Sequence, residues 1–97
     1  MSVTLINVFE VKPGLEDEAL AYWERCAAVL RKQPGFVSTR LHRALRPDAR
    51  FALVNVAEWE SPQRFEAAVS SREFEAVAAE GTEKYPHCPA LYQVVRE

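Results

Sequence analysis

The stretch Phe51-Ala-Leu-Val-Asn-Val-Ala-Glu-Trp59 is the clearest sign of a β-sheet in this chain. Period-two alternation places Phe51, Leu53, Asn55, Ala57 and Trp59 on one face of the strand that it predicts. A second stretch, Thr4-Leu-Ile-Asn-Val-Phe-Glu-Val11, repeats the pattern, with Leu5, Asn7, Phe9 and Val11 on one face. Each predicted strand therefore directs one asparagine into an otherwise apolar layer.

These two asparagines need an explanation, because an amide buried without partners costs roughly 1 to 3 kcal/mol. One interpretation is structural: Asn7 and Asn55 bond each other or the end of a helix. The other is functional: both amides face a pocket and bind a ligand. We take the second as the working hypothesis and expect the functional site where the asparagines meet.

The remaining sequence predicts two helices and two further strands. Residues 15 to about 33 have the apolar face of an amphipathic helix, which Pro34-Gly35 ends. A strand over about 36–44 and a turn at 46–50 lead into the strand at 51–59 as a hairpin. Ser61-Pro62 starts the second helix, Ser70-Ser71 offers a further cap, and a last strand is expected over 91–95.

The order βαββαβ indicates an α+β, ferredoxin-like fold in a single domain, residues 1–97, with a four-stranded antiparallel sheet and two helices on one face. The other face of the sheet would carry Ile6, Val8, Val54 and Val56. Such a β-branched patch needs a cover, and the simplest closed solution is a symmetric homodimer in which two sheets face each other.

Composition narrows the function. The net charge is -2, so we expect no nucleic-acid partner, and arginines near the predicted hairpin fit a solvated strand edge. No long apolar run predicts a membrane span, and the N-terminus has no signal-peptide pattern, so the expectation is a cytoplasmic protein. Cys26 and Cys88 fit reduced thiols. His87 and Cys88 are adjacent but have no third ligand at a suitable spacing, so no metal site is expected.

Over nearly its whole length the chain resembles the antibiotic biosynthesis monooxygenase family of dimeric α+β barrels. The similarity rests on Asn7 followed by Pro13-Gly14, on the helix exit Gln33-Pro-Gly-Phe36, on Asn55-Val-Ala-Glu-Trp-Glu-Ser61 leading to Phe65, and on Ser71 to Phe74. The family includes cofactor-free anthrone and quinol oxygenases and some heme-degrading enzymes.

The resemblance implies catalytic roles for three residues. Asn7 matches an asparagine shared by anthrone oxygenases and heme degraders, and Asn55 and Trp59 match the asparagine and tryptophan that anthrone oxygenases place beside the substrate. Phe65 stands where some of them have a tyrosine, so no phenol is available there for proton transfer. Ala78 stands where the heme-degrading branch needs its axial histidine, which argues against heme.

The implied chemistry needs no cofactor, because a deprotonated phenol or anthrone can pass an electron to O2 directly. The amides of Asn7 and Asn55 would donate to the resulting oxyanion, and preorganised donors of this kind are worth roughly 3 to 4 kcal/mol each. His87 and Tyr92 are the candidate bases, and the alternative is that an acidic substrate loses its proton to water. Aromatic and polar residues expected to surround the substrate are Phe9, Trp23, Phe51, Phe65, Phe74, His87 and Tyr92.

Two functions follow as hypotheses. The first is a cofactor-independent monooxygenase that oxidises a small planar aromatic or quinol-type substrate with O2. The alternative is a non-catalytic dimeric barrel that binds a small hydrophobic ligand, in which Trp23 and Phe65 are core residues.

Overall fold

The computed structural model describes residues 2–97; Met1, which the expected single domain includes, lies outside them. The elements follow the predicted order, with one addition in the helices. They are β1 (Val3–Phe9), α1 (Glu16–Leu30), β2 (Phe36–Arg43), β3 (Leu53–Trp59), α2 (Pro62–Val69), α3 (Arg72–Ala78) and β4 (His87–Tyr92).

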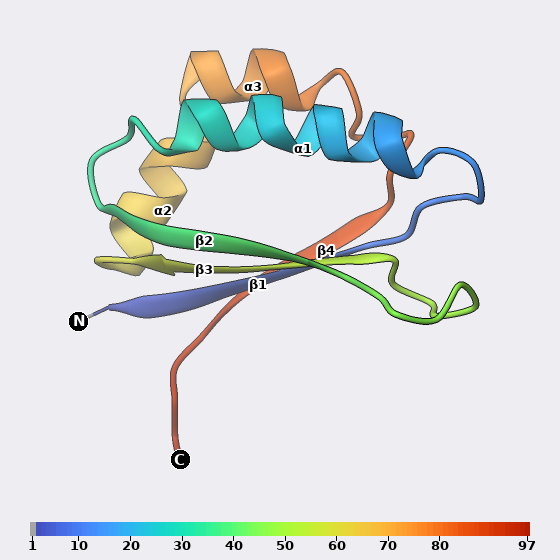
Figure 1. Ribbon diagram of the computed structural model, residues 1–97. Coiled ribbons are helices and arrows are strands. Elements are labelled where there is room, and N and C mark those ends of the chain that lie inside the picture. Colours follow the sequence, from blue (N-terminus) through green and yellow to red (C-terminus); the bar gives the residue numbers. More distant parts are fainter. Residues whose placement is uncertain (1) are drawn as a thin grey trace.

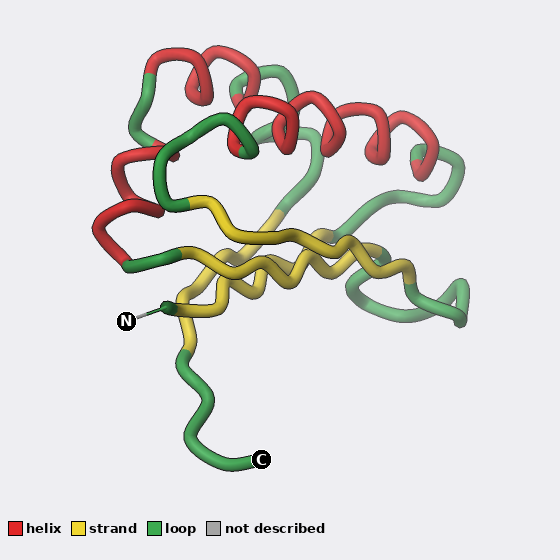
Figure 2. The backbone as a smooth tube through the Cα atoms, turned by 60° about the vertical axis from the view of Figure 1, so that its left-hand side comes forward, coloured by secondary structure: helices red, strands yellow, loops and turns green. Residues whose placement is uncertain are grey.

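The four strands form one antiparallel sheet in the order β2-β3-β1-β4, and the helices cover one of its faces (Figures 1 and 2). This is the expected α+β ferredoxin-like arrangement, with three helices in place of two. The extra helix arises at Ser71, whose hydroxyl accepts from the Phe74 amide at 3.2 Å and donates to the Ala68 carbonyl at 2.7 Å. The cap ends one helix and begins the next.

Helix α1 is shorter than predicted, because the chain leaves the helix at Arg31 and turns through residues 31–35 into β2. Its first turn carries Glu16, Asp17 and Glu18, which favours the helix start through the helix dipole. Within residues 2–97, no helix has both the length and the apolar character that crossing a membrane requires.

The last strand differs most from its prediction, since β4 covers His87–Tyr92 rather than residues 91–95. The prolines Pro86 and Pro89 are typical of a loop, but within the described residues β4 is an edge strand whose one neighbour is β1. A proline is tolerated on an edge strand, where its missing N–H faces away from the ladder. The first and third strands are also shorter than expected: β1 ends at Phe9, and β3 begins at Leu53.

Alternation along β1 and β3 holds as predicted. Leu5 and Phe9 on β1, and Leu53, Ala57 and Trp59 on β3, are buried beneath the helices. They belong to two apolar clusters. One gathers around Phe9, Trp23 and Tyr85, and the other around Leu5, Trp59 and Ala68. The two asparagines lie on the same strand faces as these clusters.

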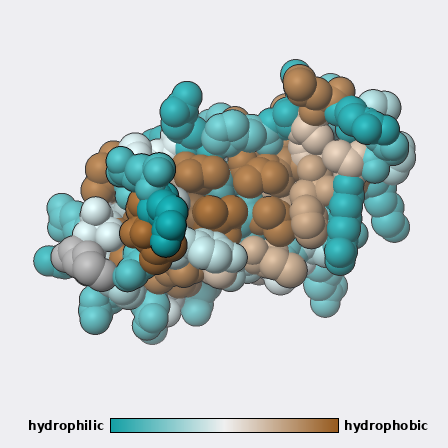
Figure 3. Space-filling view, turned by 90° about the horizontal axis from the view of Figure 1, so that it is seen from below, coloured by the Kyte–Doolittle hydropathy of each residue, from teal (hydrophilic) through white to brown (hydrophobic). Residues whose placement is uncertain are grey.

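The opposite face of the sheet has no helix over it, and we call it the open face. Ile6 pairs with Val56 and Val8 pairs with Val54 across β1 and β3, and all four side chains are half-buried. Figure 3 views the molecule from this side and shows hydrophobic residues gathered in its middle. The C-terminal segment after β4 runs away from the sheet on the same side (Figure 1).

Candidate active site

A cavity of about 290 Å³ lies between the sheet and the helices. The strands supply its floor and the helices its cover. Its lining comprises Leu5, Asn7 and Phe9 from β1; Tyr22, Trp23, Cys26, Ala27 and Leu30 from α1; Phe36 and Thr39 from β2; Asn55, Ala57 and Trp59 from β3; Phe65 and Val69 from α2; Phe74 and Ala78 from α3; and Thr82, His87 and Pro89.

Asn7 and Asn55 are directly opposite each other in the register of β1 and β3. Both line the cavity, so the two strands present their amides side by side. The structural interpretation allowed a bond between them or to the end of a helix, but among residues 2–97 the Asn7 Oδ1 atom is buried without a hydrogen-bond partner. The Asn55 Oδ1 atom accepts instead from the Thr39 hydroxyl at 2.5 Å.

Trp59 is the most deeply buried large side chain, with 1% of its surface exposed. Its indole is held between two rings that meet it edge-on, Phe36 at 5.5 Å and Phe65 at 5.6 Å between ring centroids. The Nε1 atom is buried, and no acceptor for it exists among the described residues. A buried indole N–H usually has a partner, so this unpaired donor is an exception that needs an explanation.

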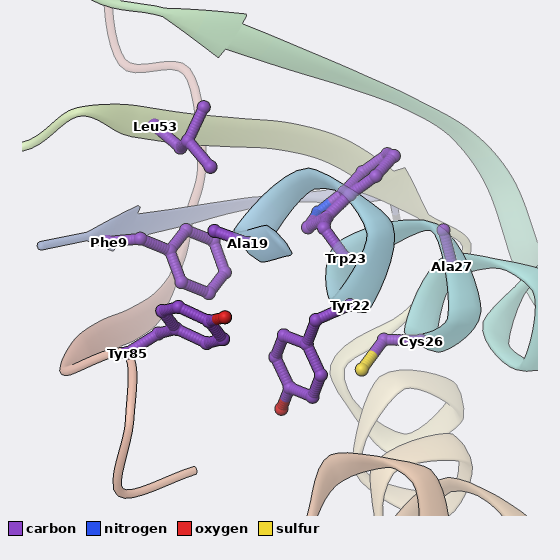
Figure 4. Close-up of a cluster of buried hydrophobic side chains, with 8 residues drawn as sticks. All are labelled: Phe9, Ala19, Tyr22, Trp23, Cys26, Ala27, Leu53 and Tyr85. Atoms are coloured by element: carbon purple, nitrogen blue, oxygen red, sulfur yellow. The ribbon is translucent and has the colours of Figure 1, made fainter. Parts of the chain in front are cut away.

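Tyr22 and Cys26 also line the cavity from α1, and Figure 4 shows Tyr22 beside Tyr85 with Cys26 one turn farther along the helix. The Tyr22 hydroxyl donates to the Ala78 carbonyl at 2.8 Å. Burial raises the pKa of both the Tyr22 hydroxyl and the Cys26 thiol. Both groups therefore stay protonated at neutral pH and are unsuited to act as bases or as a thiolate nucleophile.

His87 also lines the cavity, and a neutral imidazole has one ring nitrogen that can accept a proton. Its ring stacks on Phe9 with centroids 5.7 Å apart, and its Nδ1 atom lies 3.1 Å from the Tyr85 carbonyl. An Nδ1–H that donates to this carbonyl leaves the lone pair on Nε2. No Asp, Glu, Lys or Arg occurs among the described residues that line the cavity.

Five of the seven residues expected around the substrate line the cavity: Phe9, Trp23, Phe65, Phe74 and His87. Tyr92 does not, which is a correction. In β4 it pairs with Thr4 and is 52% exposed, because alternation from His87 and Pro89 turns it to the open face. Phe51 is also absent from the lining, since it lies before β3 begins and its ring packs under the Arg50 guanidinium at 5.0 Å.

The sequence analysis missed Thr39, the only hydroxyl that β2 brings to the cavity. A β-bulge between Phe36 and Ser38 shifts the alternation by one residue, so Phe36 opposes Trp59 while Thr39 opposes Ala57. Uninterrupted alternation from Phe36 would place Thr39 on the open face. Tyr22 and Cys26 belong to the apolar face predicted for the first helix, and both line the cavity.

His87 and Cys88 project to opposite faces of β4, so the pair does not converge on one ion. Within the described residues, no group of three or more His, Cys, Asp and Glu side chains is placed to hold a metal. Ala78, at the position where the heme-degrading enzymes need a histidine, lines the cavity with a methyl group.

The chain is similar to known proteins both in sequence and in structure. Residues 2–80 match the antibiotic biosynthesis monooxygenase family. No curated protein matches the sequence.

Three solved structures illustrate the similarity. A protein of Shewanella loihica PV-4, for which monooxygenase activity has been suggested, is 35% identical, with a TM-score of 0.85 over 99% of this chain and 96% of that one. SnoaB, a cofactor-independent oxygenase from Streptomyces nogalater, is 28% identical, with a TM-score of 0.85 over 99% and 95%.

Rv0793 from Mycobacterium tuberculosis is 18% identical, with a TM-score of 0.79 over 100% of this chain and 98% of that one, and it shares the fold. The match over residues 2–80 covers the strands β1, β2 and β3 and all three helices. This chain belongs to the antibiotic biosynthesis monooxygenase family.

Proposed function

We propose that this protein is a monooxygenase that uses neither metal nor flavin and oxidises a small planar aromatic or quinol-type substrate with O2 in the cavity. The observation that carries the proposal is the convergence of Asn7, Asn55 and Trp59 on one apolar cavity, with polar atoms that the protein leaves unpaired. The similarity to SnoaB, a cofactor-independent oxygenase, supports it.

The proposed reaction starts from an anion. Loss of a proton converts the substrate into an enolate or phenolate, which passes one electron to O2. The substrate radical and superoxide then join in a carbon–peroxide bond. At a methylene carbon, cleavage of the O–O bond leaves one oxygen as a carbonyl and releases the other as water, so that CH2 and O2 become C=O and H2O.

The side chains of the cavity suit the first steps of this chemistry. Amide N–H groups of Asn7 and Asn55 and the indole N–H of Trp59 would donate to the oxyanion of the enolate. Donors held in place before the reaction stabilise a developing charge without reorganisation, which is the largest effect in many enzymes. The apolar lining strengthens these bonds by excluding water.

His87 is the base in this scheme. Its Nδ1–H would donate to the Tyr85 carbonyl and its Nε2 atom would accept the substrate proton. Tyr22 and Cys26 do not serve as bases, because burial raises their pKa values and keeps both groups protonated, and Tyr92 lies outside the cavity.

The size of the cavity limits the substrate. At about 290 Å³ it is just below the usual range for ligand pockets, roughly 300 to 1,000 Å³. The aromatic side chains of Trp59, Phe65 and Phe74 in the lining favour a flat ring system over a branched aliphatic one.

The working unit in this proposal is a homodimer. The paired side chains Ile6 with Val56 and Val8 with Val54 give the open face a central apolar patch that a second copy of the sheet would cover. Contact between two sheets across this face leaves each cavity on the helix side of its own subunit.

A non-catalytic ligand carrier is the second candidate, favoured by a lining that holds no carboxylate or ammonium group among the described residues. Oxygen uptake separates the two functions. The purified protein would be mixed with a panel of anthrones and quinols in an oxygen electrode, and the products would be analysed by mass spectrometry for one added oxygen atom from ¹⁸O2.

The oxygenase predicts O2 uptake with at least one planar substrate and label in the product. The Asn55→Ala variant should lose this uptake, whereas Gln63→Ala, which removes an exposed amide from α2, should retain it. Tight binding of panel members without any oxygen uptake would overturn the oxygenase and leave the carrier.

A further inference from the structure

A hydrogen bond between two polar side chains of the cavity joins Thr39 on β2 to Asn55 on β3. The Thr39 hydroxyl donates to the Asn55 Oδ1 atom at 2.5 Å. Asn55 is 7% exposed, so the bond is shielded from water and is stronger than it would be at the surface. Thr39 opposes Ala57, whose small side chain leaves room for the hydroxyl to reach the neighbouring asparagine.

In this bond the Asn55 amide turns its Oδ1 atom towards Thr39 and directs its Nδ2 group away from β2. An asparagine amide can rotate by half a turn at little cost in shape, which exchanges a donor for an acceptor. With Oδ1 engaged by Thr39, the carbonyl oxygen is held at the β2 side. The Nδ2–H2 group, for which no protein acceptor exists among residues 2–97, is left for the cavity.

Threonine is well suited to orienting the Asn55 amide. A β-branched side chain has a restricted χ1 angle in a strand, so its hydroxyl is already oriented before a ligand arrives. Asn7, at the opposed position on β1, has no equivalent restraint, because its Oδ1 atom has no partner among the described residues. The two amides are therefore unequal, with Asn55 oriented and Asn7 free to adapt.

We infer that Thr39 is a positioning residue that makes Asn55 a dedicated hydrogen-bond donor, so that the cavity prefers the anionic form of a phenolic or enolic ligand to its neutral form. A donor stabilises a phenolate oxygen more than a phenol oxygen, whereas a rotated amide would present its own oxygen to the anion and repel it. The inference deepens the proposed function, on which it rests for the identity of the ligand.

The preference for the anion can be measured without turnover. The probe is 2-hydroxyanthraquinone, a planar phenol that is already oxidised and whose phenolate absorbs at longer wavelength than the phenol. Titration of the probe with saturating protein gives the apparent pKa of the bound phenol. Wild type should lower this pKa relative to the free probe.

Three variants test the role of Thr39. Thr39→Val removes the hydroxyl and keeps the shape, and it should raise the apparent pKa of the bound probe by about one unit, a loss of about tenfold in preference for the phenolate. Thr39→Ser restores a hydroxyl and should recover most of the wild-type value. In Thr39→Val/Asn55→Ala, the threonine change should add nothing to the effect of Asn55→Ala, because it acts through that residue.

Thermal unfolding of each variant establishes that the fold is intact, and Thr39→Ala makes the same comparison should Thr39→Val not fold. An unchanged bound pKa in the folded Thr39→Val variant, or a Thr39→Ser variant that behaves like Thr39→Val, would overturn the inference. The proposed function fails separately. A protein that selects the phenolate through Thr39 but consumes no O2 with any panel substrate keeps the positioning role and loses the oxygenase.

Discussion

Asn7 and Asn55 face each other across β1 and β3 as register partners, yet their amides are held differently. The carbonyl oxygen of Asn55 accepts from Thr39, whereas that of Asn7 is buried without a partner among residues 2–97. The carbonyl oxygen of one amide is thus bonded within the protein, and that of the other is not. We therefore expect substitutions of Asn7 and of Asn55 to differ in their effects on activity and on stability.

For activity, we expect Asn55→Ala to lower kcat about 100-fold and Asn7→Ala to lower it less, because the oriented donor contributes more to the transition state. Steady-state kinetics on a substrate found in the oxygen-uptake panel measure both. The double variant should lose less than the product of the two single effects, since both amides donate to one oxyanion. A larger loss for Asn7→Ala than for Asn55→Ala would contradict this ranking.

For stability, Asn7→Val should raise the free energy of unfolding by about 1 kcal/mol, because it removes a buried acceptor without a partner and suits a strand. Asn55→Val is the matched control, with the same chemical change at the opposed position. It should lower the free energy of unfolding, since the Thr39 hydroxyl loses its acceptor. Urea denaturation measures both, and equal shifts in the two variants would refute the difference between the amides.

Proton transfer by His87 predicts a change in the pH dependence of the rate. In His87→Gln, kcat/KM should fall about 100-fold, and its dependence on pH should follow the ionisation of the substrate alone. His42→Gln is the control, because the His42 Nδ1 atom lies 3.2 Å from the Val54 carbonyl on an exposed strand position outside the cavity. A wild-type pH profile in His87→Gln would show that the proton leaves by another route.

Burial of Tyr22 predicts a loss of stability in alkali. Its pKa is raised above the ordinary 10.0, so above that pH the unfolded chain releases a proton that the folded protein keeps. The unfolded state binds fewer protons there, and the free energy of unfolding falls as the pH rises. Below that pH this contribution is fully present. Cys26, whose pKa is raised above 9.0, contributes in the same direction at somewhat lower pH.

The measurement is urea denaturation from neutral to strongly alkaline pH. Tyr22→Phe should be less stable than wild type at neutral pH, because it loses the bond to the Ala78 carbonyl, and should show a shallower decline in alkali. Tyr92→Phe, which removes an exposed phenol, should follow the wild-type curve. Parallel curves for wild type and Tyr22→Phe would mean that Tyr22 ionises normally in the folded protein.

The homodimer predicts that charge on the open face separates the subunits. Val54→Lys/Val56→Lys places two ammonium groups among apolar partners and should convert a dimer into a monomer in sedimentation velocity experiments. Ala28→Lys adds a charge on the exposed side of α1 and should leave the dimer intact. Sedimentation of the wild-type protein as a monomer at micromolar concentration would rule out the proposed assembly.

Alternation in β1 and β3 was sufficient to place Asn7, Asn55 and Trp59 on the face that lines the cavity, because both strands are regular and central. The edge strand was harder to predict. Pro86 and Pro89 indicate a loop in isolation, and only pairing with β1 makes residues 87–92 a strand, which turns Tyr92 away from the cavity. The same sheet contacts determine where β3 begins, and so they leave Phe51 outside it.

Alternation could not predict that Thr39 faces the cavity, because the pattern of apolar and polar residues in this strand does not indicate the bulge before it. Phe36 and Thr39 are separated by an odd number of positions, yet both side chains reach the cavity. The extra residue at the bulge exchanges the two faces of β2 between Phe36 and Thr39. As a result, the Phe36 ring contacts Trp59 and the Thr39 hydroxyl bonds Asn55 on the same side of the sheet.

The parity change has a consequence for how this strand tolerates length variation. A residue inserted between Ser38 and Thr39 would exchange the two faces of β2 from that point on and turn Thr39 out of the cavity. A residue deleted at Val37 would instead restore a regular ladder and leave Thr39, Leu41 and Asn55 in their present relation. An insertion after Ser38 thus removes Thr39 from the cavity, whereas a deletion at Val37 keeps it there. The side chains that β2 places in the cavity floor depend on their position relative to the bulge, not on their position relative to the start of the strand.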